Sequence, residues 1–324
     1  MALLEVKGLE VRFPMRQGEL TALRDVSFSL DKGERLGIVG ESGAGKSVAA
    51  FAILNLISRP GYISKGEIIF EGSDLAKMND RQLRSIRGNR INMIFQDPMM
   101  TLNPVLTIGT QMIECLRTHM NLNTEQAREK SIDKLRQVQI PSPEERIDQY
   151  PHELSGGMRQ RVVIAIALLT DPSVIIADEP TTALDVTIQA EIMELLLALC
   201  ENSDVALMLI THDLGVVSQV TQRTVVMYAG RVVEEGPTRQ IIENARHPYT
   251  HGLIAALPER TNPGMRLNQI PGVMPSLAAI PPGCSFHPRC EHAMDVCRSE
   301  LPGYVMDGGF RVACHWVAKR EQQQ

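Results

Sequence analysis

The sequence predicts an α/β protein with a doubly wound core, a helical insertion and a small cysteine-containing C-terminal extension. Short apolar runs separated by glycine open the chain, and one of them leads into a glycine-rich loop followed by a helical pattern. Long helical patterns between prolines then occupy residues 107–171. After about residue 246 the chain becomes rich in Pro, Gly and Cys, with little periodicity.

Strand and helix patterns alternate along the predicted core, which is typical of a parallel sheet covered by helices. Runs rich in Val, Leu, Ile and Phe predict strands at residues 9–13, 26–30, 35–39, 67–70, 91–95, 174–177, 206–211 and 224–228. Helical periodicity predicts helices at residues 47–57, 124–138, 157–169 and 188–199. We therefore predict a core domain over residues 1–246, with a helical subdomain at about 97–171, and an extension over residues 247–324.

Composition limits the classes of function. The 324 residues are 44% apolar, which is enough for a sizeable core, and the net charge of −5 gives no reason to expect nucleic acid as a partner. No apolar run approaches the ~20 residues that cross a bilayer, and the N-terminus lacks the pattern of a signal peptide. We expect a cytoplasmic protein that other subunits hold at any membrane on which it acts.

The loop Gly40-Glu41-Ser42-Gly43-Ala44-Gly45-Lys46-Ser47 has the spacing of a phosphate-binding loop. Its glycines let backbone N–H groups turn toward phosphate oxygens, with the N-terminus of the next helix adding to the attraction. Lys46 supplies a charge to the β- and γ-phosphates, and the Ser47 hydroxyl is a magnesium ligand. An ordinary glycine-rich turn is the alternative, and the strand before the loop and the helix after it favour phosphate binding. The residues expected to bind nucleotide here are Gly40, Ser42, Gly43, Gly45, Lys46 and Ser47.

Two acids, Asp178 and Glu179, follow the apolar run at residues 174–177. At the end of a buried strand, Asp178 is expected to contact the magnesium site. Glu179 points to the opposite side of the strand, where a carboxylate is able to polarise the attacking water. A plain strand end is the alternative, and the upstream phosphate loop makes the catalytic interpretation the better one.

The run Leu154-Ser155-Gly156-Gly157-Met158-Arg159-Gln160-Arg161 lies between the loop and the acids. These three features in this order resemble the ATPase subunit of an ABC transporter. The resemblance implies that Ser155 and Gly157 face the γ-phosphate of ATP bound by another protomer. Met158 departs from the commonest form of the family, which has Gln there, and we infer no loss of activity from it.

The same resemblance implies roles for four more residues. Gln96 matches the glutamine that contacts magnesium and water, and Asp185 ends the loop Ala183-Leu184-Asp185 that passes between protomers. His212 matches the histidine that contacts the γ-phosphate. Phe13 falls where the family stacks an aromatic ring on adenine, although a core phenylalanine explains that position nearly as well. The resemblance thus implies Glu179, His212 and Gln96 as the catalytic residues.

Four stretches resemble the branch of ABC importers for oligopeptides, dipeptides and nickel: residues 95–104, 178–190, 227–230 and 247–250. The resemblance implies ATP and Mg²⁺ as cofactors and a second ATPase subunit as partner, a paralogue forming a heterodimer. It further implies two membrane permeases and a periplasmic or extracellular substrate-binding protein. The chain would lie peripherally on the cytoplasmic face of the membrane. Import of nickel or another small solute, a soluble non-transport ATPase, and a cassette that binds ATP without hydrolysing it are the alternatives.

Four of the six cysteines lie in the predicted extension, at Cys284, Cys290, Cys297 and Cys314. Four thiolates suit zinc or an iron–sulfur cluster, and unligated structural cysteines are the third alternative. Short Cys-x2–4-Cys knuckles are absent, which weakens zinc. Alternative ligands in this part of the chain are His287, His292 and His315. Some members of the resembled branch carry an iron–sulfur cluster, so the resemblance, rather than the spacing, favours a 4Fe–4S centre with a folding role.

Overall fold

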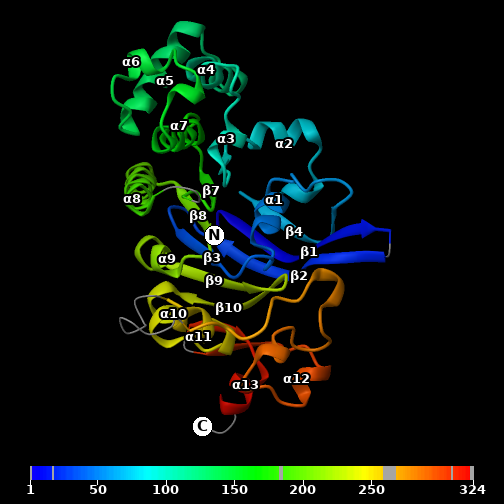
Figure 1. Ribbon diagram of the computed structural model, residues 1–324. Helices are drawn as coiled ribbons and strands as arrows, with labels where there is room; N and C mark the ends of the chain where they lie inside the picture. Colours follow the sequence, from blue (N-terminus) through cyan, green and yellow to red (C-terminus); the bar gives the residue numbers. More distant parts are fainter. Residues whose placement is uncertain (1, 17, 182–184, 258–267, 308, 322–324) are drawn as a thin grey trace. The chain divides into compact units, whose positions relative to one another are not determined.

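The structure is a computed structural model that describes residues 2–16, 18–181, 185–257, 268–307 and 309–321. The chain forms two compact units. Unit 1 contains Met1–Asp31, Arg35–Lys77 and Leu209–Gln324, and unit 2 contains Lys32–Glu34 and Met78–Met208. Figure 1 labels many of their helices and strands.

Unit 1 contains an antiparallel sheet in the order β2-β1-β4-β5. Buried and exposed side chains alternate along its central strand, where Leu4, Val6, Leu9 and Val11 face the core. A register shift between Val6 and Leu9 preserves this alternation along a long strand. The strands are β1 (Leu4–Met15), β2 (Gly18–Leu30), β4 (Tyr62–Phe70) and β5 (Ser73–Asp74).

A second group of strands in unit 1 has the order β11-β12-β10-β9-β3. β3 and β9 are parallel, whereas β10 pairs antiparallel with both β9 and β12. The strands are β3 (Arg35–Val39), β9 (Arg223–Tyr228), β10 (Arg231–Pro237), β11 (Tyr304–Asp307) and β12 (Phe310–Ala313). The helices of unit 1 are α1 (Lys46–Ile53), α9 (Leu214–Val220), α10 (Thr238–Asn244), α11 (Pro248–Ala255), α12 (Val296–Ser299) and α13 (His315–Glu321). Short 3₁₀ turns lie at Leu75–Lys77, Leu277–Ala279 and His287–Arg289.

One buried cluster in unit 1 joins side chains from both sides of residue 246. Val39 at the end of β3 and Tyr228 at the end of β9 pack in the same core as Tyr249, Phe286 and Cys314. The three aromatic rings stack edge-on or tilted, with centroids 4.7–5.4 Å apart. The cysteine-containing segment thus shares its core with β3 and β9. The division into domains at residues 1–246 and 247–324 stays a prediction from the sequence.

Unit 2 is mainly helical, and α4, α5, α6 and α7 lie together within it (Figure 1). Caps define its helix boundaries. The Thr107 side chain accepts a hydrogen bond at the start of α4, and Asn123 and Gln126 form a capping box at the start of α5. The helices are α2 (Asp80–Ile86), α3 (Pro98–Thr101), α4 (Ile108–His119), α5 (Thr124–Gln137), α6 (Pro143–Arg146), α7 (Gly156–Leu168) and α8 (Val186–Ser203), with a 3₁₀ turn at Pro151–Glu153.

Two parallel strands of unit 2, β6 (Ile91–Ile94) and β7 (Val174–Asp178), are almost wholly buried. The next strand, β8 (Ala206–Thr211), carries the chain from unit 2 into unit 1. Parallel pairing, intervening helices and an all-helical segment confirm the predicted α/β class with its helical insertion. In the described ranges, no helix is both long enough and apolar enough to cross a membrane.

Candidate functional site

The predicted phosphate loop of unit 1 connects β3 to α1. Gly43 and Gly45 have φ values of 83° and 100°, which glycine adopts without strain. The Lys46 side chain is 6% exposed, and its Nζ donates to the carbonyl oxygens of Gly40 and Glu41 over 2.8 and 3.2 Å. The loop is thus a closed turn with its lysine folded onto its own backbone, as the strand–loop–helix pattern predicts.

The connection between β9 and β10 supports the phosphate loop from one side. Gly230 N–H donates to the Ala44 carbonyl over 2.9 Å. Gly40 lies so close to the same connection that a Cβ there would be 2.3 Å from the Met227 carbonyl oxygen. Only glycine fits this approach. Residues 227–230, which the sequence marked only by family resemblance, therefore have a structural role beside the loop.

A second support comes from α11. The His247 side chain caps this helix by accepting a hydrogen bond from Tyr249 N–H over 3.0 Å, and Pro248 occupies its first turn. Burial lowers the pKa of His247 to about 3, so the ring is neutral and able to accept. The cap orients the fully buried Tyr249, whose hydroxyl accepts a hydrogen bond from Glu41 N–H over 2.8 Å. Sequence reasoning missed this contact, although it singled out residues 247–250.

The predicted catalytic acids of unit 2 lie at the carboxyl end of β7. Asp178 is 5% exposed, and Glu179 has a φ of 46°, an uncommon conformation for a residue with a side chain. Gln96 follows β6, the parallel neighbour of β7, and its Nε2 donates to Glu179 Oε2 over 3.1 Å. Two residues that the sequence places 83 positions apart are therefore in direct contact. This arrangement fixes the direction of a carboxylate at the end of the strand.

The predicted signature run of unit 2 forms the start of α7. Ser155 is the N-cap, and its hydroxyl accepts a hydrogen bond from Met158 N–H over 3.3 Å. Gly157 packs toward α8, since a Cβ there would be 3.1 Å from Ile188 Cγ2. Arg159 donates to the Pro151 carbonyl over 2.7 Å and connects the helix to the preceding turn. Ser155 is exposed at a helix N-terminus, which is a favourable place for an anion.

The sequence also predicted roles for three further residues. His212 is exposed directly after β8, and Asp213 caps α9 behind it. Asp185 is exposed at the N-cap of α8, whereas Ala183 and Leu184 lie outside the described residues. The Phe13 ring is half-buried against Gly61, where a Cβ would be 2.4 Å from it. That contact explains Phe13 as a packing residue, and its adenine-stacking role stays a prediction.

The four cysteines of the extension lie near one another but do not form a finished metal site. Burial, with smaller contributions from the neighbouring Cys284 and Cys290, raises the pKa of Cys314 to about 11. Burial likewise raises the pKa values of Cys284 and Cys290, with a contribution from Cys297 in both cases. All four are free thiols. Within the described part of the chain, however, no group of three or more His, Cys, Asp or Glu side chains is arranged to hold a metal ion. The structure therefore gives the predicted iron–sulfur centre no support.

Comparison with known proteins agrees with the geometry of both units. Residues 23–182 match the ABC transporter family, and residues 233–297 match the C-terminal region of oligopeptide/dipeptide transporters. The oligopeptide transport ATP-binding protein OppD of Bacillus subtilis (strain 168) is 51% identical over 302 residues, which cover 93% of this chain and 84% of that protein. The dipeptide transport ATP-binding protein DppD of Escherichia coli (strain K12) is 47% identical over 317 residues, covering 98% and 97%.

Solved structures show the same fold. The ATP-binding cassette MJ0796, in a dimeric post-hydrolysis state bound to ADP and Pi, superposes with a TM-score of 0.65 at 29% identity and covers 73% of this chain and 99% of its own. CbiO1 of Clostridium perfringens, part of the ABC transporter complex CbiONQ, superposes with a TM-score of 0.63 at 27% identity and covers 75% and 91%. Four observations agree: the phosphate loop, the two acids after β7, the helix capped by Ser155, and the nearly full-length relatives. The chain therefore belongs to the ATP-binding subunits of the ABC transporter family.

Proposed function

We propose that the chain is the ATP-hydrolysing subunit of an importer that carries di- or oligopeptides across the cytoplasmic membrane. The main support for ATP hydrolysis is the hydrogen bond from Gln96 to Glu179. It orients a carboxylate at the strand end where the family hydrolyses ATP. Support for the peptide cargo comes from the matched C-terminal region and from the peptide-transport relatives.

One group of residues neutralises the charge of the ATP phosphates, and another accepts the proton from the attacking water. Lys46 and the loop N–H groups hold the β- and γ-phosphates, and Ser155 with Gly157 of a partner would close on the γ-phosphate. The oxygen donors of Ser47 and Gln96 would hold Mg²⁺, and Asp178 is the acid expected to contact the magnesium site. When bound, the ion would neutralise charge on the phosphates. Glu179 accepts the proton as water attacks the γ-phosphorus and ADP leaves, while His212 contacts the γ-phosphate.

The proposed transporter needs partner subunits, because one chain supplies a single phosphate loop and a single signature helix. A second ATPase subunit, a paralogue in our proposal, would complete each ATP site, and the dimeric MJ0796 cassette supports such pairing. Two permeases would hold the pair peripherally on the cytoplasmic face of the membrane. A periplasmic or extracellular binding protein would deliver the peptide.

We predict that the isolated chain is mainly monomeric and hydrolyses ATP slowly. Turnover should rise by at least about tenfold when the paralogous ATPase and both permeases are present, since only then are the sites complete. Light scattering gives the mass of the isolated chain, and steady-state ATPase assays compare it with the purified complex. Full activity from a monomer would contradict the composite site.

We also propose that Cys284, Cys290, Cys297 and Cys314 hold a 4Fe–4S cluster that stabilises the extension. Their number and their thiol chemistry support this proposal, and their arrangement in the described residues does not. Cluster binding would need the thiols to lose their protons, because thiolates are the ligands of such clusters.

The metal content of the protein separates the alternatives for these cysteines. Protein purified without oxygen should contain about four irons and four sulfides per chain and should show broad visible absorption. About one zinc per chain without iron would instead assign a structural zinc site. Metal-free protein with a folded extension would contradict both metal assignments and leave the cysteines as packing residues.

A further inference from the structure

Glu41 places a negative charge inside the loop that is expected to receive the phosphates of ATP. Its N–H donates to the Tyr249 hydroxyl over 2.8 Å, and its carbonyl accepts from Lys46 Nζ over 3.2 Å and from Ala44 N–H over 3.1 Å. The residue is therefore built into the loop rather than beside it. An uncompensated carboxylate here would repel a nucleotide that carries several negative charges. A cation that pairs with Glu41 would remove this repulsion.

Arg289 of the C-terminal extension supplies that cation. Its Nη1 and Nη2 donate to Glu41 Oε2 and Oε1 over 2.7 and 3.0 Å, across 248 positions of sequence. Two parallel hydrogen bonds of this kind fix both the direction and the distance of the two groups. The hydrogen bonds to Glu41 raise the pKa of Arg289 above its ordinary value, so the guanidinium stays charged. The Arg289 side chain is 5% exposed and that of Glu41 is 31% exposed.

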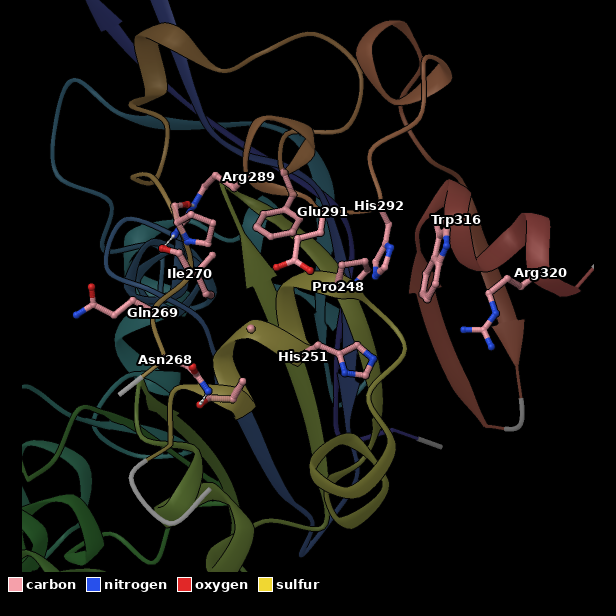
Figure 2. Close-up of a pocket in the computed structure, with 14 residues that line it drawn as sticks. Pro248, His251, Asn268, Gln269, Ile270, Arg289, Glu291, His292, Trp316 and Arg320 are labelled. Atoms are coloured by element: carbon pink, nitrogen blue, oxygen red, sulfur yellow. Dashed lines mark hydrogen bonds between the residues drawn. The ribbon is translucent and has the colours of Figure 1, made fainter. Parts of the chain in front are cut away.

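The rest of the extension fixes the guanidinium of Arg289. Its Nε donates to the Pro271 carbonyl over 2.8 Å, and Nη2 reaches the Ile270 carbonyl over 3.4 Å. Figure 2 shows Arg289 beside Ile270 in the wall of a cavity of about 530 Å³. The arginine thus comes from a backbone turn adjacent to Cys290, with its charged end already directed at the phosphate loop.

We infer that Arg289 is a positioning residue of the phosphate loop, which neutralises Glu41 and thereby sets the affinity of the loop for ATP. The extension is then a working part of the nucleotide site, although it lies outside every nucleotide motif in the sequence. The inference rests on the proposed ATP binding at this loop. A change that displaces the turn at His287–Arg289 would therefore weaken ATP binding without altering Glu179 itself.

A purely structural role for the ion pair predicts something different. If the pair only attached the extension to the loop, removing either the Arg289 or the Glu41 side chain would lower stability. Removing both side chains would then not restore ATP binding. If Arg289 acts by neutralising Glu41, removing the carboxylate as well should restore it. The combination of Arg289→Ala with Glu41→Gln therefore distinguishes the two roles.

The experiment measures Kd for a fluorescent ATP analogue with Mg²⁺ on the full-length chain, at low and high salt. Arg289→Ala should raise Kd by about tenfold or more at low salt, because Glu41 then repels the phosphates, and salt should reduce the defect. Glu41→Gln alone should bind the analogue at least as tightly as the parent, because the Arg289 cation remains and the repelling carboxylate is gone. The double variant should return most of the way to the parent. Arg289→Lys should be intermediate, since lysine keeps the charge but loses the paired geometry.

Arg239→Ala is the matched control, because Arg239 pairs with Glu243 on the exposed face of α10. Should Arg289→Ala fail to fold, the longer neutral side chain of Arg289→Gln, with and without Glu41→Gln, makes the same comparison. A double variant that binds as weakly as Arg289→Ala, or an Arg289→Ala protein with parental Kd and a lower Tm, would overturn the inference. Failure of the parent to bind the analogue would instead count against the proposed function.

Discussion

Replacing Glu179 by glutamine is expected to stop ATP hydrolysis in the assembled transporter while leaving ATP binding intact. Glutamine keeps the size of the side chain and its hydrogen-bonding reach toward Gln96, but an amide cannot accept a proton from water. Losing a general base lowers turnover by about 100- to 10,000-fold. The bound nucleotide should then persist, because in the proposed mechanism the paired ATPase subunits close on ATP and reopen after its hydrolysis.

Steady-state ATPase assays and nucleotide affinity, both on the purified complex, test the Glu179→Gln prediction. Glu194→Gln is a matched control, since Glu194 is an exposed residue of α8 in the same unit. It should hydrolyse ATP at the parental rate. If Glu179→Gln does so too, Glu179 is not the residue that activates water.

Replacing Lys46 by alanine is expected to abolish turnover by a different route, the loss of phosphate binding. The Lys46 ammonium is buried at the start of α1, where the family places the β- and γ-phosphates against it. Removing one partner of a buried charge pair costs about 2–5 kcal/mol, so Kd for ATP should rise by about 100-fold. Lys46 also donates to two carbonyls of the loop, and its loss should loosen the loop as well.

Equilibrium binding of ATP to the Lys46→Ala chain tests this expectation, with thermal unfolding to show that the protein is folded. Lys77→Ala is the control, because the Lys77 side chain is 73% exposed at another place in unit 1. A folded Lys46→Ala chain with parental affinity would contradict the assignment. Glu179→Gln and Lys46→Ala together separate orientation of water from binding of phosphate.

Local features of the site could be predicted from the sequence because neighbouring residues determine them. The loop between β3 and α1 follows from glycine spacing and from the strand and helix around it. The contact between Gln96 and Glu179 was not predicted, although parallel strands bring their carboxyl ends to one edge and β6 is the parallel neighbour of β7. Helix boundaries differ by a few residues from the prediction, and α1 ends at Ile53 rather than near residue 57.

Long-range contacts of the extension could not be predicted from the sequence. Its composition indicated a separate segment, yet β12 pairs with β10 and Phe286 packs against Tyr228. No local pattern indicates that Arg289 meets Glu41, because the pairing depends on how the whole of unit 1 folds. The available signal was electrostatic: a carboxylate in a phosphate loop calls for a cation, and the sequence alone does not say which of its many arginines supplies it.

ATP hydrolysis by this chain is expected to drive the uptake of peptides. Transport in proteoliposomes tests this claim most directly. Vesicles would contain the complex with both ATPases and both permeases, with binding protein and labelled di- or tripeptide on the substrate side and ATP on the side of this chain. We predict peptide accumulation that requires ATP, that is lost with Glu179→Gln, and that is unchanged with Glu194→Gln. ATP-dependent accumulation of nickel without peptide, or peptide uptake unaffected by Glu179→Gln, would contradict the claim.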